Sequence, residues 1–214
     1  EQVYGAMENA ALAVGRSITT TSAGVGLPTP YREGQTYVDL DQYFQLWDAS
    51  RKRLEQACGH KIALEIEPGR YLVAESGYLV TEIRAIKQTG GNTFYLLDAG
   101  FNNLARPILY GAYHPMSVCP AGAAGHATEG HGGRSLQDVV VGGPLCESGD
   151  IFTQEEGGFV CKRSLPTAEV GDYLIIERAG AYGFVMASNY NSKPMAAEVL
   201  LKDGQAHLIR ARQS

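Results

Sequence analysis

A change of pattern near residue 75 limits the fold of this chain more than any other feature. Before it, apolar residues recur at helical spacing over residues 1–14 and 40–58, and a short β-prone segment follows each helical pattern. After it, alternating segments and glycine turns dominate, and no long amphipathic helix is expected. The sequence therefore predicts a first domain with an α/β part over residues 1–75, followed by a mainly β domain over residues 76–214.

The first domain is expected to run helix, strand, helix, strand, which is typical of a parallel α/β unit. Its strands are predicted over residues 17–21 and 61–66, and Asp39 or Asp41 is expected to cap the second helix. The apolar face of that helix is predicted to comprise Tyr43, Leu46, Trp47, Leu54, Ala57 and Cys58. Two such steps cannot close an eight-stranded barrel. Because the chain also starts without methionine and within a helical pattern, we expect it to be a piece of a larger protein.

The second domain is expected to consist of short strands joined by turns. Residues 77–87 and 93–97 alternate around Gly90, Gly91 and Asn92, which predicts a hairpin. Further strands are predicted over residues 139–141 and 172–177, and the strand pattern continues over residues 199–209 about Asp203 and Gly204. These segments predict an antiparallel β-sandwich or barrel.

Composition and charge exclude several classes of partner. The 18 Lys and Arg against 23 Asp and Glu give a net charge of −5 without a basic run, so no nucleic acid is expected. No apolar run approaches the ~18 residues of a membrane span, so no membrane is expected. The four cysteines lack the paired spacing of metal sites and predict reduced thiols in a cytoplasmic protein.

A glycine- and histidine-rich stretch over residues 121–133 is predicted to be a loop. Within it, His126 and His131, with Glu129 between them, are residue types that bind metals. A polar loop is the favoured interpretation, so no metal site is predicted. The other histidines, His60, His114 and His207, are interpreted as structural.

Two glycine-containing loops follow the strands predicted in the first domain. Gly24-Val25-Gly26 follows one strand, and Glu67-Pro68-Gly69-Arg70 follows the other. Loops at the carboxyl ends of parallel strands build the sites of α/β barrels, and glycine turns let backbone N–H groups approach a phosphate. The alternative for each loop is a plain turn.

Three segments of the second domain carry chemically useful side chains. Cys146 is followed by Glu147 in a glycine-framed loop and is either a proton donor or a small buried cysteine. Arg106, four residues before Tyr110, either binds a carboxylate or forms a surface ion pair. Tyr182 lies between small residues and is either exposed to a ligand or part of the core.

Five motifs follow one another along nearly the whole chain. They are Leu64–Arg70, Asp98–Asn102, Arg106–Gly111, Gly143–Asp150 and Gly180–Gly183. In sequence and order they resemble the diaminopimelate decarboxylases, which are fold-type III pyridoxal-phosphate enzymes. The resemblance implies that residues 1–75 are the C-terminal part of a partial (β/α)8 barrel that binds pyridoxal 5'-phosphate, with residues 76–214 as its antiparallel β domain.

The resemblance also implies an activity. Members of this family decarboxylate meso-2,6-diaminopimelate at its D-centre to give L-lysine and CO2 in lysine biosynthesis. They work as homodimers, and the loop that matches Cys146 and Glu147 reaches into the active site of the partner subunit. An amino-acid substrate and a second copy of the chain are therefore the expected partners.

Site residues follow from the same resemblance. The cofactor-binding residues would be Gly26, Glu67, Pro68, Gly69, Arg70 and Tyr182. The substrate-binding residues would be Arg70, Arg106 and Tyr110 for a carboxylate, Glu147 for the distal ammonium group, and Tyr182. Cys146 would be the catalytic proton donor.

Two departures from the family pattern limit what the chain is expected to do alone. The glycine loop of the family carries three glycines, and Val25 stands in place of the middle one. The Schiff-base lysine of the family lies on an early barrel strand, and no lysine of this chain stands in a matching motif. We therefore expect the chain to be roughly the C-terminal half of the enzyme and to be inactive by itself.

Two rival interpretations stay open. One is a related decarboxylase that acts on ornithine, arginine or carboxynorspermidine. Relatives that take an amino acid with a single carboxylate place Asp after the cysteine, so Glu147 together with Arg106 favours a substrate with a distal carboxylate. The other is a non-catalytic β-domain module that only dimerises, which the missing lysine supports.

Overall fold

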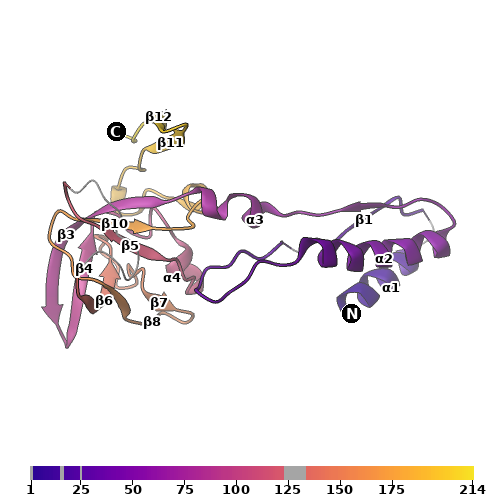
Figure 1. The fold of residues 1–214 in the computed structure, drawn as a ribbon, viewed down its shortest axis with the longest axis horizontal. Helices are drawn as coiled ribbons and strands as arrows, with labels where there is room; N and C mark the ends of the chain where they lie inside the picture. The colour runs from indigo at the N-terminus through magenta and orange to yellow at the C-terminus, as the bar shows by residue number, and fades with distance from the viewer. Residues whose placement is uncertain (1, 15–16, 25, 123–133) are drawn as a thin grey trace. The chain divides into compact units, whose positions relative to one another are not determined.

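The computed structural model describes residues 2–14, 17–24, 26–122 and 134–214. They form two compact units, Glu1–Leu72 and Val73–Ser214, each described here by itself (Figure 1). Val25 lies outside the described residues, and so does most of the loop predicted over residues 121–133, including His126, Glu129 and His131.

The first unit has the predicted order of helix, strand, helix and strand. Its elements are α1 (Gln2–Val14), β1 (Thr20–Ser22), α2 (Leu40–Cys58) and β2 (Ala63–Glu65). The two strands pair in parallel, with Ser22 opposite Glu65. That this pair belongs to a larger barrel stays a prediction.

Side-chain and backbone caps define both ends of α2. The Asp39 carboxylate accepts a hydrogen bond from the Gln42 N–H at 3.0 Å, so Asp39 and not Asp41 is the cap. At the other end, Gly59 takes a left-handed conformation with φ 82°, and its N–H donates to Glu55 O at 2.8 Å. The boundaries predicted for this helix are therefore confirmed.

Only part of the predicted apolar face of α2 is buried. Trp47 and Leu54 are buried, whereas Leu46 and Ala57 are exposed. Ser50 is fully buried instead, and its Oγ donates to Glu8 Oε1 of α1 at 2.6 Å. A polar contact between α1 and α2 therefore replaces part of the apolar face expected from periodicity.

The second unit is built on a six-stranded sheet with the strand order β5-β10-β3-β4-β6-β9. Its strands are β3 (Leu79–Thr89), β4 (Asn92–Leu97), β5 (Met116–Cys119), β6 (Leu136–Gly142), β9 (Arg163–Pro166) and β10 (Tyr173–Ile176). Two further pairs are β7 (Gln154–Glu155) with β8 (Phe159–Val160), and β11 (Glu198–Lys202) with β12 (Gln205–Arg210). Its helical turns are η1 (Ala74–Ser76), α4 (Arg106–Tyr110), η2 (Phe184–Met186) and η3 (Tyr190–Ser192), while α3 (Gly69–Val73) spans the boundary between the two units along the chain.

The large sheet is mixed, so the prediction of an antiparallel domain holds for every pair of this sheet except one. Strands β4 and β6 run in parallel, with Phe94 opposite Val140, while the other pairs of this sheet are antiparallel. A parallel pair needs a long connection, and the chain supplies it through α4 and β5. Side chains alternate with a period of two in parallel and antiparallel strands alike, so the sequence pattern could not show that β4 and β6 run in parallel.

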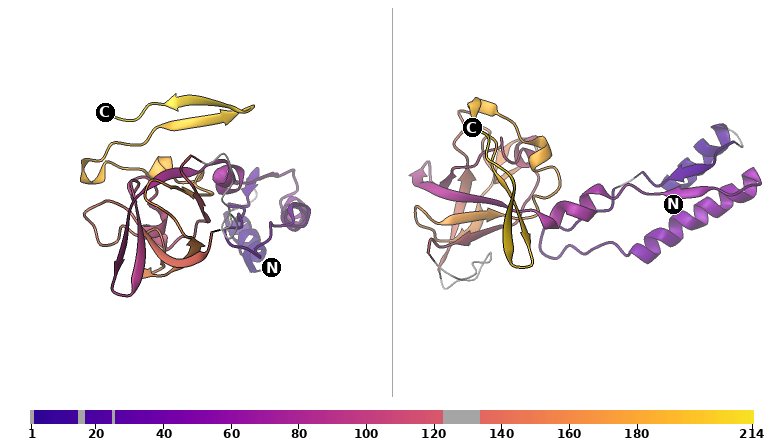
Figure 2. Two further views of the ribbon diagram at one scale, coloured as in Figure 1. Left: turned by 60° about the vertical axis from the view of Figure 1, so that its left-hand side comes forward. Right: turned by 90° about the horizontal axis from the view of Figure 1, so that it is seen from above.

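The two edge strands β5 and β9 lie close together, which makes the sheet a nearly closed barrel. The predicted hairpin over residues 77–97 is confirmed, and the pattern predicted about Asp203 and Gly204 forms a second hairpin. Gly90 and Gly91 turn β3 into β4 with φ 58° and 76°, and Asp203 and Gly204 turn β11 into β12 with φ 51° and 73°. Figure 2 shows β11 and β12 as a hairpin of their own, outside the six-stranded sheet.

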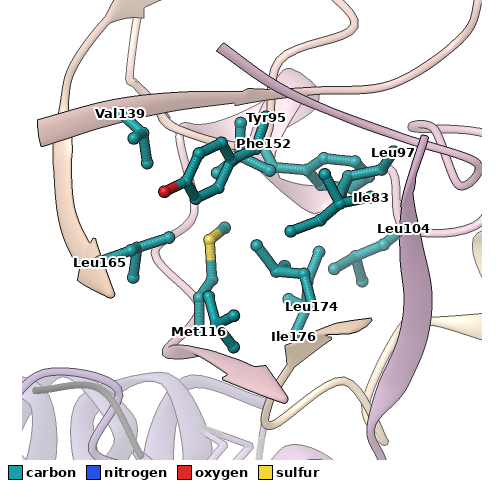
Figure 3. Packing of buried hydrophobic residues seen from close by; sticks show 12 residues of the cluster. Ile83, Tyr95, Leu97, Leu104, Met116, Val139, Phe152, Leu165, Leu174 and Ile176 are labelled. Carbon is teal, nitrogen blue, oxygen red and sulfur yellow. The ribbon is translucent and has the colours of Figure 1, made fainter. Parts of the chain in front are cut away.

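A single hydrophobic cluster fills the inside of this sheet. Tyr95, Met116 and Leu165 come from three different strands and meet in its interior (Figure 3). The one polar atom of Tyr95 is satisfied, since its hydroxyl donates to Pro166 O and accepts from Ala168 N–H, each at 3.1 Å. Each fully buried side chain of this size contributes roughly 1.5–3 kcal/mol to folding. The cluster therefore stabilises the sheet from which the loops of the second unit extend.

Two further sequence predictions concern the whole chain. No helix in the described residues is both long and apolar enough to cross a membrane. The four cysteines are free thiols, as predicted.

Candidate active site

The two loops predicted to bind a phosphate lie next to each other at the carboxyl ends of the two parallel strands. Ala23 N–H donates to Glu65 O at 2.8 Å, which continues the pairing past the strand ends. Ser22 Oγ accepts from Gly24 N–H at 3.1 Å and donates to Glu67 Oε1 at 3.5 Å. The first unit therefore brings together the loop around Gly24 and the loop around Glu67.

The residues of these two loops suit a pyridoxal phosphate. Gly24 has φ 53°, and no heavy atom stands within 4 Å of the Cβ positions of Gly26 and Gly69. Open backbone of this kind, next to the half-buried Arg70, suits a phosphate group. The exposed carboxylate of Glu67 suits a cationic ring nitrogen instead.

The short helix α4 presents Arg106 and Tyr110. Pro107 in its first turn favours a helix start, and Gly111 ends the helix in a left-handed conformation with φ 57°. A Cβ on Gly111 would stand 2.0 Å from Glu156 N. Only glycine fits there, so the sequence determines where the helix ends.

Arg106 is buried, with 6% of its surface exposed, so the alternative of a surface ion pair is wrong. Its Nη1 lies 3.2 Å from Nε2 of His114. Its guanidinium carbon lies 5.8 Å from the centre of the Tyr182 ring, within the range of a cation–π contact. Tyr110 is 60% exposed at the other end of α4. The structure thus brings Arg106 and Tyr182 together.

Tyr182 stands on a tight turn that depends on its glycines. A Cβ on Gly180 would lie 1.9 Å from Val73 O, and one on Gly183 would lie 2.3 Å from Ala179 O. The backbone of Tyr182 itself is left-handed, with φ 61°, which is uncommon for a bulky residue. Its side chain is 41% exposed, so the alternative of a core tyrosine is wrong.

Asp150 shapes the loop that carries Cys146. It is 3% exposed and accepts hydrogen bonds from Phe101 N–H and Leu145 N–H, both at 2.8 Å, while Gly143 N–H donates to its backbone carbonyl at 2.9 Å. Burial raises the pKa of Asp150, and the two N–H donors oppose that shift. This carboxylate therefore supports the loop from inside rather than facing a ligand.

Cys146 and Glu147 lie at the exposed tip of this loop. The Cys146 N–H donates to Asn191 Oδ1 at 2.7 Å. Glu147 Oε1 accepts from Gly149 N–H at 3.2 Å, and its Oε2 accepts from the Tyr190 hydroxyl at 3.4 Å. The alternative of a buried cysteine is wrong, because Cys146 is exposed. Its loop is held by two residues of η3, Tyr190 and Asn191.

Sequence reasoning missed the two residues that hold this loop, Tyr190 and Asn191. Asn191 has φ 53°, and the ring of Tyr190 lies 4.8 Å from that of Phe101. They belong to η3, a turn too short to show any periodicity. The available signal was the Asn189-Tyr190-Asn191 run, because asparagine favours left-handed turns.

The loop and α4 adjoin each other in the second unit. A Cβ on Gly149 would stand 2.9 Å from Cδ1 of Ile108, which belongs to α4. Arg106, Tyr110, Tyr182, Cys146 and Glu147 therefore lie on neighbouring parts of one unit, while Gly26 and the Glu67–Arg70 segment belong to the other. No group of three metal-binding side chains occurs among the residues described.

Comparison with known proteins gives this arrangement a family. Residues 31–180 match the pyridoxal-dependent decarboxylases, in their C-terminal sheet domain. The diaminopimelate decarboxylase of Escherichia coli strain K12 is 49% identical over 219 residues, which cover 100% of this chain and 50% of that protein.

Two solved structures extend the likeness to the fold. A crystal structure of diaminopimelate decarboxylase has a TM-score of 0.92 at 48% identity and covers 100% of this chain and 49% of its own. The Helicobacter pylori diaminopimelate decarboxylase complexed with L-lysine has a TM-score of 0.78 at 31% identity and covers 100% and 48%. This chain spans about half the length of these relatives. It belongs to the pyridoxal-dependent decarboxylase family and carries the C-terminal sheet domain of that family.

Proposed function

We propose that this chain works as part of a cytoplasmic diaminopimelate decarboxylase, which converts meso-2,6-diaminopimelate into L-lysine and CO2. The observation that carries the proposal is that the second unit presents two opposite charges, each suited to one group of the distal amino-acid end of the substrate. Arg106 is a buried guanidinium beside Tyr182, and Glu147 is a carboxylate at the tip of the adjoining loop. The first suits a distal carboxylate, and the second suits a distal ammonium group. The names of the relatives support the same substrate.

The first unit supplies the cofactor-binding side of this proposal. Gly26, Gly69 and Arg70 would hold the phosphate of pyridoxal 5'-phosphate, Pro68 would shape the turn, and Glu67 would face the ring nitrogen. When bound, the cofactor supplies an electron sink for the charge left by the departing CO2. Because no lysine of the chain stands in a matching motif, the 214 residues alone are proposed to lack turnover.

The second unit supplies the residues that act on the substrate. Arg106 and Tyr110, with Arg70, would bind and orient the distal carboxylate, and Tyr182 would contact both substrate and cofactor. The Cys146 thiol would deliver a proton to the carbon that loses CO2. Since Cys146 N–H is held by Asn191 and Glu147 by Tyr190, the proton donor and the ammonium-binding group keep a fixed spacing.

The enzyme is proposed to be a homodimer that shares its active sites. The loop around Cys146 is exposed and polar but well ordered by Asp150, which suits a loop offered to a neighbouring subunit. A two-fold axis uses the same surface on both subunits, so each could donate Cys146 and Glu147 to the active site that holds Arg106 of the other. Residues 77–214 would carry the main contact, with an obligate interface of roughly 2,000 Å² or more.

A substrate panel tests the proposed function. Purified protein expressed from its complete gene is assayed for CO2 release from meso-diaminopimelate, L-ornithine, L-arginine and carboxynorspermidine. We expect kcat/KM to be at least about a hundredfold higher for meso-diaminopimelate, because the other three leave Arg106 without a distal carboxylate. Comparable use of L-ornithine would contradict the proposal, and Arg106→Gln is the control that should shrink the preference.

A further inference from the structure

His114 is a fully buried histidine that contacts a candidate substrate-binding residue. It precedes β5 and exposes 0% of its surface. Its Nε2 lies 3.2 Å from Nη1 of Arg106, and its Nδ1 lies 3.0 Å from the backbone carbonyl oxygen of Glu177. Each ring nitrogen therefore faces one hydrogen-bonding group, a guanidinium nitrogen at Nε2 and a carbonyl oxygen at Nδ1.

The chemistry of those partners determines the tautomer of the imidazole. A guanidinium has only donors, so Nε2 of His114 must accept from Arg106. A carbonyl oxygen only accepts, so Nδ1 must carry the hydrogen and donate to Glu177 O. The ring is therefore neutral, with its hydrogen on Nδ1.

The surroundings keep His114 neutral. Burial lowers the pKa of His114 to about 4, and the positive charges of Arg106 and Arg163 act in the same direction. Arg163 faces it from β9, donating from Nη1 to His114 O at 2.9 Å. The Glu177 carboxylate, next to β10, accepts from Ser117 Oγ at 2.6 Å. An imidazolium could not accept from Arg106, so only the neutral ring can hold it.

We propose that His114 is a positioning residue whose neutral Nδ1–H imidazole orients the Arg106 guanidinium for the distal carboxylate of the substrate. The inference rests on the proposed function for the role of Arg106. An arginine whose guanidinium group is already held in its binding orientation loses less side-chain entropy when the substrate binds. His114 thus acts through Arg106 and does not touch the substrate.

Two substitutions separate the two hydrogen bonds of the ring. His114→Gln keeps an oxygen that can accept from Arg106, and His114→Asn keeps a donor near Nδ1 but no longer reaches Arg106. In the protein expressed from its complete gene, we expect His114→Asn to raise KM for meso-diaminopimelate about tenfold with kcat within about twofold. His114→Gln should restore KM to within about threefold of the wild type.

The same substitution in an Arg106→Gln background shows whether His114 acts through Arg106. We expect Arg106→Gln to raise KM by itself and His114→Asn to add nothing further. If His114→Asn raises KM equally in both backgrounds, its role is general packing and the inference fails. If Arg106→Gln raises KM but His114→Asn does not in the wild type, the inference fails and the proposed function stands. If Arg106→Gln leaves KM unchanged, the proposed role of Arg106 fails and the inference with it.

A measurement on the unaltered protein tests the tautomer of His114 and does not depend on enzyme activity. In ¹⁵N NMR spectra of protein labelled at histidine, we expect one imidazole to show a protonated Nδ1 and a bare Nε2 across neutral pH. That signal should disappear in His114→Gln. An imidazolium, or an Nε2–H tautomer at this position, would overturn the inference even if a variant failed to fold.

Discussion

Single side chains in the second unit organise the candidate site through hydrogen bonds inside the fold. Asp150 holds the Cys146 loop from within, and His114 holds Arg106. Removing one member of such a buried pair leaves the other without its partner, which costs more than the net value of the bond. Substitutions at the exposed tip and at the buried supports should therefore have different consequences.

Cys146→Ala should separate chemistry from folding. Cys146 is exposed, and its described hydrogen bond to Asn191 is donated by the backbone N–H, which alanine keeps. The variant should therefore fold and bind cofactor normally. A positioned proton donor contributes about 10²–10⁴-fold to rate, and we expect a loss of kcat in that range. Single-turnover rates and the visible absorbance of bound cofactor measure the two properties. A variant with near-normal kcat would show that the thiol has no part in proton transfer.

His114 should make stability depend on pH in a defined window. Its pKa is about 4 in the folded chain against an ordinary value of 6.5, so the unfolded chain binds the proton first as pH falls. Stability is then lost between about pH 6.5 and pH 4, by about 3 kcal/mol in total from this group. Urea unfolding across that range measures it. His114→Gln should remove this part of the slope, and an unchanged slope would contradict the assignment.

At the scale of elements, the sequence predicted what local rules determine. The cap at Asp39 and the glycine turns at Gly90 and Gly204 were identified because each depends on nearby residues only. Strands β5 and β9 were not predicted, although β10, which is as short, was. β9 ends in Pro166, and proline is depleted in strands. The direction of β6 was missed because it depends on a distant pairing with β4.

The candidate site shows the same division. Cys146, Glu147, Arg106 and Tyr182 were named from motifs, and the structure shows that Arg106 is buried and that the other three are exposed. Of the residues that support them, His114 was interpreted only as structural, and Tyr190 and Asn191 were not named. Burial brings His114 to Arg106, and η3 comes to the Cys146 loop from more than forty positions away, as the 45-residue separation of Asn191 from Cys146 shows. Contacts of that kind follow from tertiary packing and leave no local pattern.

The cap of α2 allows a matched test of local stabilisation. Asp39 accepts a hydrogen bond from Gln42 N–H, whereas Asp41 lies in the first turn without the capping role. Asp39→Ala should lower the free energy of unfolding by about 1 kcal/mol, and Asp41→Ala should lower it by less, through the helix dipole alone. Equal losses in urea unfolding of the two variants would show that the charge, and not the cap, stabilises this helix.

In the proposed homodimer, two subunits complete each active site. Arg70 belongs to the first unit and Cys146 to the second. Arg70→Ala and Cys146→Ala, each inactive alone, should recover activity when mixed and allowed to exchange subunits. About a quarter of wild-type activity is expected at equal mixing, because half the dimers are mixed and each holds one intact site. No recovery, with exchange verified by native mass spectrometry, would mean that each site is built within one chain.

The proposed reaction is a decarboxylation at one end of a symmetric diamino diacid, followed by protonation of the same carbon. The most direct measurement incubates the protein from its complete gene with pyridoxal phosphate and meso-diaminopimelate in D2O, then identifies the products by NMR and mass spectrometry. We expect one CO2 per L-lysine, with a single deuterium on the carbon that lost its carboxylate and none at the retained centre. Unconsumed diaminopimelate, or a product that keeps both carboxylates, would contradict it.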